Sequence, residues 1–163
     1  MPAYTDIGGL YQVSGVDSAA TQNGGEYRNN GKEREIEVTI NLASLTETET
    51  VLFDNIFMPA GMKITEVEIF VETAAATGTA IDVGFVRTDR TTEIDYDGVL
   101  AAFVTATMTV GNKIVLRKSG TQAGAMVGSG VATANVGHIT ASRTTATAFT
   151  AGQIKVTIRY ERP

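Results

Sequence analysis

Hydrophobic and polar residues alternate along much of the chain from Glu35 onward, and this alternation is typical of β-strands with one buried face. The clearest runs are 35–42, 63–73, 80–87 and 153–160, in which apolar residues largely occupy every second position. Less regular runs predict three more strands, at 51–57, 108–117 and 139–149. Turn signals such as Pro59-Ala60-Gly61 separate these short strands.

The segment 98–105 (GVLAAFVT) is open to two interpretations, because a short apolar run has no readable period. It fits one or two helical turns with the carboxylate of Asp97 as the N-cap, and it fits a buried strand equally well. The neighbouring segments 88–97 and 119–130 predict loops. We therefore expect about eight short strands and at most one short helix. Turn signals at intervals of roughly 8–12 residues favour an all-β fold, an antiparallel β-sandwich of jelly-roll type.

Residues 1–34 have a different character and predict an extended N-terminal arm, followed by a β-sandwich domain over residues 35–163. Residues 14–32 are rich in Gly, Asn and Ser and contain two turn signals, Asn23-Gly24-Gly25 and Asn29-Asn30-Gly31. The arm also carries apolar side chains that a plain spacer does not need: Tyr4, Ile7, Leu10, Tyr11 and Val13. The segment is either a frayed terminus or an arm that orders on a neighbouring subunit, with these five residues as its contacts.

Composition supports the β prediction and excludes several classes of partner. Thr occurs at 24 positions and favours strands, while 17 Gly residues supply turns. The net charge of −5 and the scatter of basic residues argue against a nucleic-acid partner. No apolar run approaches the ~18 residues of a membrane span, and the N-terminus does not resemble a signal peptide. Cys is absent, so disulfides and thiol chemistry are excluded.

Motifs that carry enzymatic chemistry are absent from the chain. His138 is the only His, and it lacks the His or Cys partners of a metal site and the context of a Ser-His-Asp triad. We expect it to have a structural role at the start of a strand. No Walker-type loop, GxSxG elbow or HExxH motif occurs. The sequence therefore predicts a protein that is not an enzyme, with no catalytic residue and no cofactor.

Carboxylates are the remaining candidates for chemistry, and five are close together in the sequence: Asp82, Asp89, Glu93, Asp95 and Asp97. Solvated loop charges are the plainest interpretation. Two carboxylates at a suitable separation also support glycoside hydrolysis. Asp95-Tyr96-Asp97 resembles the start of a calcium loop, although the Gly and distal Glu of an EF-hand do not follow. We expect no metal, and name Asp95 and Asp97 as the ligands to test for one.

Two stretches of the sequence resemble small structural proteins of tailed-phage virions. The first is Phe57-Met58-Pro59-Ala60-Gly61-Met62-Lys63-Ile64-Thr65-Glu66-Val67, followed by Thr79-Ala80-Ile81-Asp82-Val83-Gly84. The second is the chain ending, Thr150 to Tyr160 (TAGQIKVTIRY). The similarity spans roughly residues 50–160, and its motifs are short. It implies a head decoration (cement) protein or a related capsid accessory subunit, and it supplies no catalytic residues.

The resemblance implies a virion protein that assembles in the host cytoplasm and stabilises the capsid surface. Its expected partners are the major capsid protein and further copies of itself, as a homotrimer, with no nucleic acid and no membrane. Multivalent clamping by the N-terminal arm would strengthen weak individual contacts. Two other functions remain open: a receptor- or carbohydrate-binding module of a head fibre or tail, and a subunit of a tail or connector ring. A polysaccharide-degrading enzyme that uses Asp82, Asp95 or Asp97 is the most distant alternative.

Overall fold

The computed structural model describes residues 4–5, 11–15, 24–30, 33–52, 56–105 and 109–162, and nearly all regular structure in them is β-strand. The first strands are β1 (Tyr4–Thr5), β2 (Tyr11–Gly15), β3 (Gly24–Asn30) and β4 (Glu33–Asn41), after which a single 3-10 turn, η1 (Leu42–Ser44), follows. The remaining strands are β5 (Thr50–Val51), β6 (Phe57–Met58), β7 (Lys63–Thr77), β8 (Ala80–Arg87), β9 (Glu93–Val104), β10 (Lys113–Leu116), β11 (Gly137–Arg143) and β12 (Phe149–Glu161).

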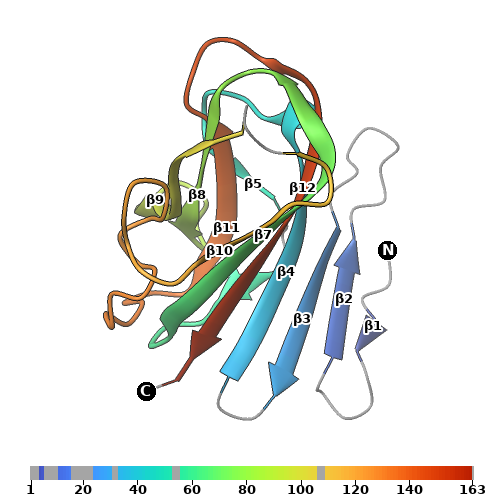
Figure 1. Ribbon diagram of the computed structural model, residues 1–163. Coiled ribbons are helices and arrows are strands. Elements are labelled where there is room, and N and C mark those ends of the chain that lie inside the picture. The colour runs from blue at the N-terminus through green and yellow to red at the C-terminus, as the bar shows by residue number, and fades with distance from the viewer. Residues whose placement is uncertain are drawn as a thin grey trace.

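The strands form two antiparallel sheets packed face to face (Figure 1). The large sheet has the order β1-β2-β3-β4-β12-β7-β10, and the small sheet has the order β5-β11-β8-β9, with β6 also paired to β11. The sandwich prediction is therefore confirmed. None of the described residues belongs to a helix that is long and apolar enough to cross a membrane.

The strand pairs are nested along the chain from β4 to β12. The innermost pair is β8 with β9 in the small sheet, and it is enclosed by β7 with β10 in the large sheet. Outside these lie β5 and β6 with β11 in the small sheet, then β4 with β12 in the large sheet. Successive pairs thus alternate between the sheets, as though one long hairpin were wrapped around the core.

The core lies between the sheets and follows from the period of two along each strand. On β4 the inward residues Ile36, Val38 and Ile40 are fully buried, while their neighbours on the other face reach solvent. Tyr160, Phe85 and Phe103 are the largest side chains that are fully buried. Because both sheets contribute alternate residues, the two outer faces are left to polar side chains, which define the surfaces of the molecule.

The ambiguous segment 98–105 is almost wholly strand, since β9 runs from Glu93 to Val104. Asp97 lies inside β9, so the proposal that it caps a helix is wrong, and the preceding polar loop ends before Glu93. The run 108–117 is shorter than predicted, because only Lys113–Leu116 is strand among its described residues. In the run 51–57, two-residue strands lie at each end, and residues 53–55 are outside the described part.

The N-terminal segment contains three strands that continue the large sheet beyond β4 (Figure 1). Gly24 and Gly25, expected in a loop, lie in β3, where Gly25 pairs with Val38. The strands β1 to β3 form an antiparallel meander with β1 as the outermost strand. The division at residue 34 into an arm and a sandwich domain stays a prediction.

Candidate functional site

The outer face of the large sheet carries acidic and basic side chains in alternation across β4, β12, β7 and β10. Arg159 on β12 lies at its centre: it binds Glu66 through Nη1, and its Nε lies 3.2 Å from a carboxylate oxygen of Glu35. Its Nη2 lies 3.6 Å from Glu68. The register explains these contacts, because Arg159 is directly opposite Glu35 on one side and Glu66 on the other.

Two Lys residues extend this arrangement along the sheet. The Nζ of Lys155 lies 3.3 Å from Glu37 and 3.6 Å from Glu72, and that of Lys113 lies 2.8 Å from Glu68. Burial opposes ionisation of Lys155, but its two carboxylate neighbours prevail and raise its pKa. Each cation therefore lies beside at least one anion on this face.

Glu66 is the most buried acid of this face, with 8% of the residue exposed. Burial alone would raise its pKa, yet hydrogen bonds and charges from Arg117 and Arg159 lower it. The Nε of Arg117 donates to Glu66 at 2.5 Å. We call the set Glu35, Glu37, Glu66, Glu68, Glu72, Lys113, Arg117, Lys155 and Arg159 the balanced face, since its five acids meet four bases.

The outer face of the small sheet carries buried polar residues of β11. His138, Thr140 and Ser142 on β11 alternate with the core residues Ile139 and Ala141, so they lie on the side away from the core. All three are nonetheless buried, with 7%, 1% and 2% exposed. Two pockets lie on this side of the sheet. Residues 47–49, the turn residues Arg90 and Thr91, and Tyr96 of β9 help to line them.

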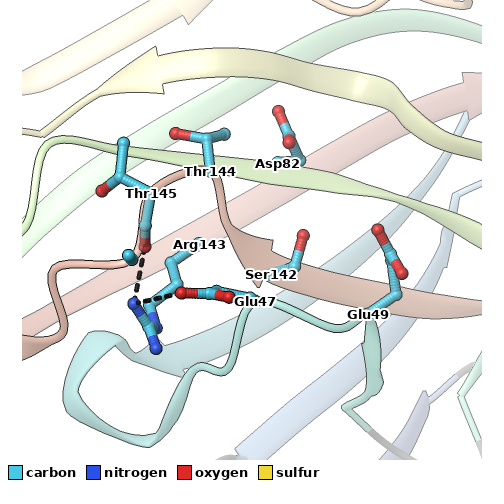
Figure 2. A pocket seen from close by; sticks show the side chains of 8 residues that line it. Glu47, Glu49, Asp82, Ser142, Arg143, Thr144 and Thr145 are labelled. Carbon is cyan, nitrogen blue, oxygen red and sulfur yellow. Dashed lines mark hydrogen bonds and ion pairs between the residues drawn. The ribbon is translucent and has the colours of Figure 1, made fainter.

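The first pocket has a volume of about 370 Å³ and lies between Glu47, Glu49, Asp82 and the end of β11 (Figure 2). Figure 2 shows Asp82, Ser142 and Glu49 extending toward the same side from three separate segments. Among the described residues, Arg143 is the one cation that lines the pocket; its Nη1 lies 3.4 Å from Glu47 and donates to the Thr145 carbonyl at 2.6 Å. Three carboxylates therefore share a pocket with a single guanidinium.

Asp82 holds an irregularity of β9 in place. Ile81 pairs with Phe103 and Val83 with Leu100, so two residues of β9 oppose Asp82 as a β-bulge. The Ala102 N–H donates to Asp82 Oδ1 at 2.7 Å, and Ala102 has a positive φ of 46°. Burial raises the pKa of Asp82, and the charges of Asp97 and Glu49 add to this increase, against the Ala102 hydrogen bond.

The second pocket, of about 280 Å³, lies on the other side of Glu49, which lines both. Thr140, Val86 and Tyr96 contribute to it from β11, β8 and β9, and Arg90 contributes from the turn between β8 and β9. Burial raises the pKa of Tyr96, and the nearby negative charges of Glu49, Glu93 and Asp89 raise it further.

Gly84 allows β9 to approach β8 closely beside this pocket. A Cβ at Gly84 would lie 2.0 Å from the Asp95 carbonyl oxygen and 2.4 Å from the Tyr96 carbonyl carbon. Only Gly fits at this close approach of the two backbones. Asp89 stabilises the preceding turn by accepting from the Thr91 and Thr92 N–H groups, both at 2.8 Å, and these bonds with that of the Thr92 hydroxyl lower the pKa of Asp89.

Asp95 and Asp97 lie two residues apart in β9, on either side of Tyr96, which lines the second pocket. Burial of Asp95, together with the hydrogen bond and charge of Asp97, raises the pKa of Asp95 to about 6. We call the outer side of the small sheet that carries Glu47, Glu49 and Asp82 the acidic face, because these three carboxylates line one pocket and the charge of Glu49 raises the pKa of Asp82. Among the described residues, no three His, Asp or Glu side chains are arranged to hold a metal ion.

Three buried polar atoms in the described part of the chain have no hydrogen-bond partner: His138 Nδ1, Thr140 Oγ1 and Arg143 Nε. All three belong to β11. His138 lies at the start of this strand, and its ring meets that of Phe57 edge to face at 6.4 Å. Buried polar groups without partners are uncommon in folded proteins, so their concentration in one strand distinguishes β11 from the other described strands.

The structure brings together only some of the residues that the sequence singled out. Asp82 lies on the acidic face and Asp95 and Asp97 lie in β9, whereas Tyr4, Tyr11 and Val13 lie in β1 and β2 at the far end of the large sheet. Ile7 and Leu10 fall outside the described residues. Glu49, Thr140 and Arg143 were missed. The alternation of polar and apolar residues in 137–143 (GHITASR) was the available signal, since it places polar residues on one face of a strand.

Comparison with known proteins identifies similar structures but no similar sequences: no family model and no curated protein matches the chain. A chain in the structure of the capsid of Ralstonia phage GP4 is similar, with a TM-score of 0.53 and 13% identity, over 83% of this chain and 87% of that one. A chain in the acidic stable capsid structure of Helicobacter pylori bacteriophage KHP30 has a TM-score of 0.50 and 10% identity, over 86% and 91%. The protein therefore has a fold that also occurs in phage capsids.

Proposed function

We propose that this protein is a non-enzymatic structural protein of a phage virion, which decorates and stabilises the capsid by binding major-capsid subunits as a homotrimer. The observation that carries the proposal is the likeness of nearly the whole chain to chains in two phage capsid structures. The resemblance of the 57–67 and 150–160 segments to virion structural proteins supports it independently of the coordinates.

The strand order adds further support, because we infer that the nested pairs from β4 to β12 form a jelly roll. Four alternating pairs supply two four-stranded sheets, β4-β12-β7-β10 and β5-β11-β8-β9. Jelly rolls of eight strands are common in viral capsid domains, although lectins and other proteins also use them. The fold alone therefore favours a binding role and does not identify the partner.

We assign the multivalent contacts to residues 1–34. The outermost strand β1 is an edge of the large sheet, and edge strands can pair with an extended segment of another subunit. In a trimer three such arms would engage together, so that modest affinity per arm yields firm attachment. Binding to the assembled shell, and not to free subunits, would stabilise the shell by mass action.

The test is co-sedimentation of the purified protein with empty capsids of its phage, before and after expansion, combined with native mass spectrometry. We expect saturable retention on expanded capsids and a free assembly of three times the 17.2 kDa chain mass. Absence of retention on both capsid forms would contradict the decoration role. A six- or twelve-membered ring in solution would instead favour a tail or connector subunit.

A further inference from the structure

We propose that the acidic face of the small sheet is a second docking surface, which binds an extended basic segment of a partner protein. A Lys or Arg side chain of that segment would enter the first pocket, between Glu49 and Asp82, and its neighbouring residues would continue over Thr140. The inference rests on the proposed function in one respect, namely that the partner is another protein of the virion. The surface itself is argued from charge, burial and spacing.

Charge is the first argument. The first pocket holds Glu47, Glu49 and Asp82 against Arg143, and Arg143 is already engaged with Glu47 and the Thr145 carbonyl. Glu49 and Asp82 line the same pocket, and the charge of Glu49 raises the pKa of Asp82. A cation placed between them would relieve this repulsion, and a Lys or Arg side chain fits the chemistry of two carboxylates.

The buried hydroxyl of Thr140 is the second argument, and it is independent of the charges. Thr140 is 1% exposed, it lines the second pocket beside Glu49, and its Oγ1 has no hydrogen-bond partner in the described part of the protein. A buried hydroxyl without a partner is costly, and a ligand that supplies a donor or acceptor removes that cost. The backbone amide and carbonyl groups of an extended peptide supply both.

The spacing of the pockets is the third argument. Ser142 lines the first pocket and Thr140 the second, two residues apart on the same face of β11. Residues two apart on a strand are separated by about 7 Å, which is also the separation of alternate side chains in an extended peptide. A peptide that lies along β11 can therefore place one side chain in each pocket, with Glu49 between them.

The experiment uses the full chain, labelled for NMR, and the blocked pentapeptide Thr-Lys-Thr-Val-Thr as the probe. We expect saturable shifts at the amides of Thr140, Ser142 and Thr144, which weaken as salt is raised because the contact is electrostatic. Replacing Lys by norleucine in the probe should weaken binding by about tenfold or more, because a hydrogen bond between charged groups is roughly twice as strong as one between neutral groups.

Variants of the protein provide the matched comparison. Glu49→Gln and Asp82→Asn should each weaken binding by about fivefold, and Asp82→Asn retains the oxygen that accepts from Ala102, so the bulge is kept. Glu37→Gln removes the same charge from the balanced face and should leave the peptide affinity unchanged.

Absence of saturable shifts, equal binding of the norleucine peptide, or an equal loss in Glu37→Gln would each overturn the proposal. The outcome is separate from that of the capsid experiment. Peptide binding without capsid retention would keep this surface and reject the decoration role, whereas capsid retention without peptide binding would reject this surface alone.

Discussion

The two outer faces of the sandwich use charge in opposite ways. On the balanced face, Arg159 and Lys155 lie between rows of Glu residues, and each of these cations contacts at least two carboxylates. On the acidic face, the charged neighbours that shift the pKa of Asp82 are Asp97 and Glu49, which are both anions. Each cation of the first face lies beside at least one carboxylate, whereas the first pocket of the other face holds three carboxylates and one guanidinium.

This difference separates stability from binding. Cross-strand pairs between neighbouring strands stabilise the sheet in which they lie, so the balanced face contributes to folding. Like charges held near one another oppose folding, and such arrangements are found where a partner supplies the opposite charge. We therefore expect substitutions on the balanced face to change stability, and substitutions on the acidic face to change binding.

The largest effect is expected for Gly84→Ala, which would disrupt the packing of β9 against β8 beside the second pocket. The added methyl group would collide with the backbone of Asp95 and Tyr96, at 2.0 Å from the nearest atom, and would displace β9. We expect a loss of about 3 kcal/mol in the free energy of unfolding, measured by chemical denaturation. Gly111→Ala is the matched control: it has a φ of 83° but no atom within 4 Å, so about 1 kcal/mol of backbone strain is expected.

Arg159→Ala tests the balanced face at its centre. Among the described residues, the substitution leaves Glu66 with Arg117 as its ion-pair partner, and Glu35 loses its contact with Arg159. We expect destabilisation of about 2 kcal/mol, less than for a fully buried pair because Arg159 keeps a third of its side chain exposed. A stability equal to the wild type in denaturant titration would show that this face is not a folding element.

Asp95→Asn tests the effect of the neighbouring acids of β9 on stability, through its dependence on pH. The folded state raises the pKa of Asp95 to about 6, so it holds the proton more tightly than the unfolded chain does. The resulting stability is present below the unfolded pKa of about 4 and is lost as pH rises through about 6. Asn cannot ionise, so we expect the variant to be more stable than the wild type by about 1 kcal/mol at pH near 8 and equal to it near pH 4. Thermal melts across this range check both limits, and a difference that does not depend on pH would contradict the account.

Lys113→Ala should give the smallest effect. Lys113 contacts Glu68 at 2.8 Å, but more than half of its side chain is exposed, and Glu68 also lies near Arg159. Exposed pairs of this kind contribute about 0.5 kcal/mol, and salt screens them. Denaturation at low and high salt should show this small loss only at low salt; a large loss at high salt would mean that Lys113 acts through packing.

The sequence alone predicted the fold better than the surfaces. Alternation in 35–42 and 153–160 identified β4 and β12 because a period of two records which face is buried. It left β9 open between a strand and a helix, because the close approach of β9 to Gly84 of β8 and the bulge at Ala102 depend on the neighbouring strand. The pockets were missed for the same reason: Glu49, Asp82 and Ser142 are far apart in the chain and meet only in the folded small sheet.

One capsid-binding assay that compares the two faces tests most directly whether the acidic face binds a partner and the balanced face does not. Wild-type protein, the double variant Glu49→Gln/Asp82→Asn and the double variant Glu37→Gln/Glu68→Gln would be titrated onto expanded capsids, and the bound protein measured after sedimentation. We predict saturable retention of the wild type, weakened retention of the acidic-face variant and unchanged retention of the balanced-face variant. Failure of the wild type to bind, or equal binding by all three proteins, would contradict this prediction.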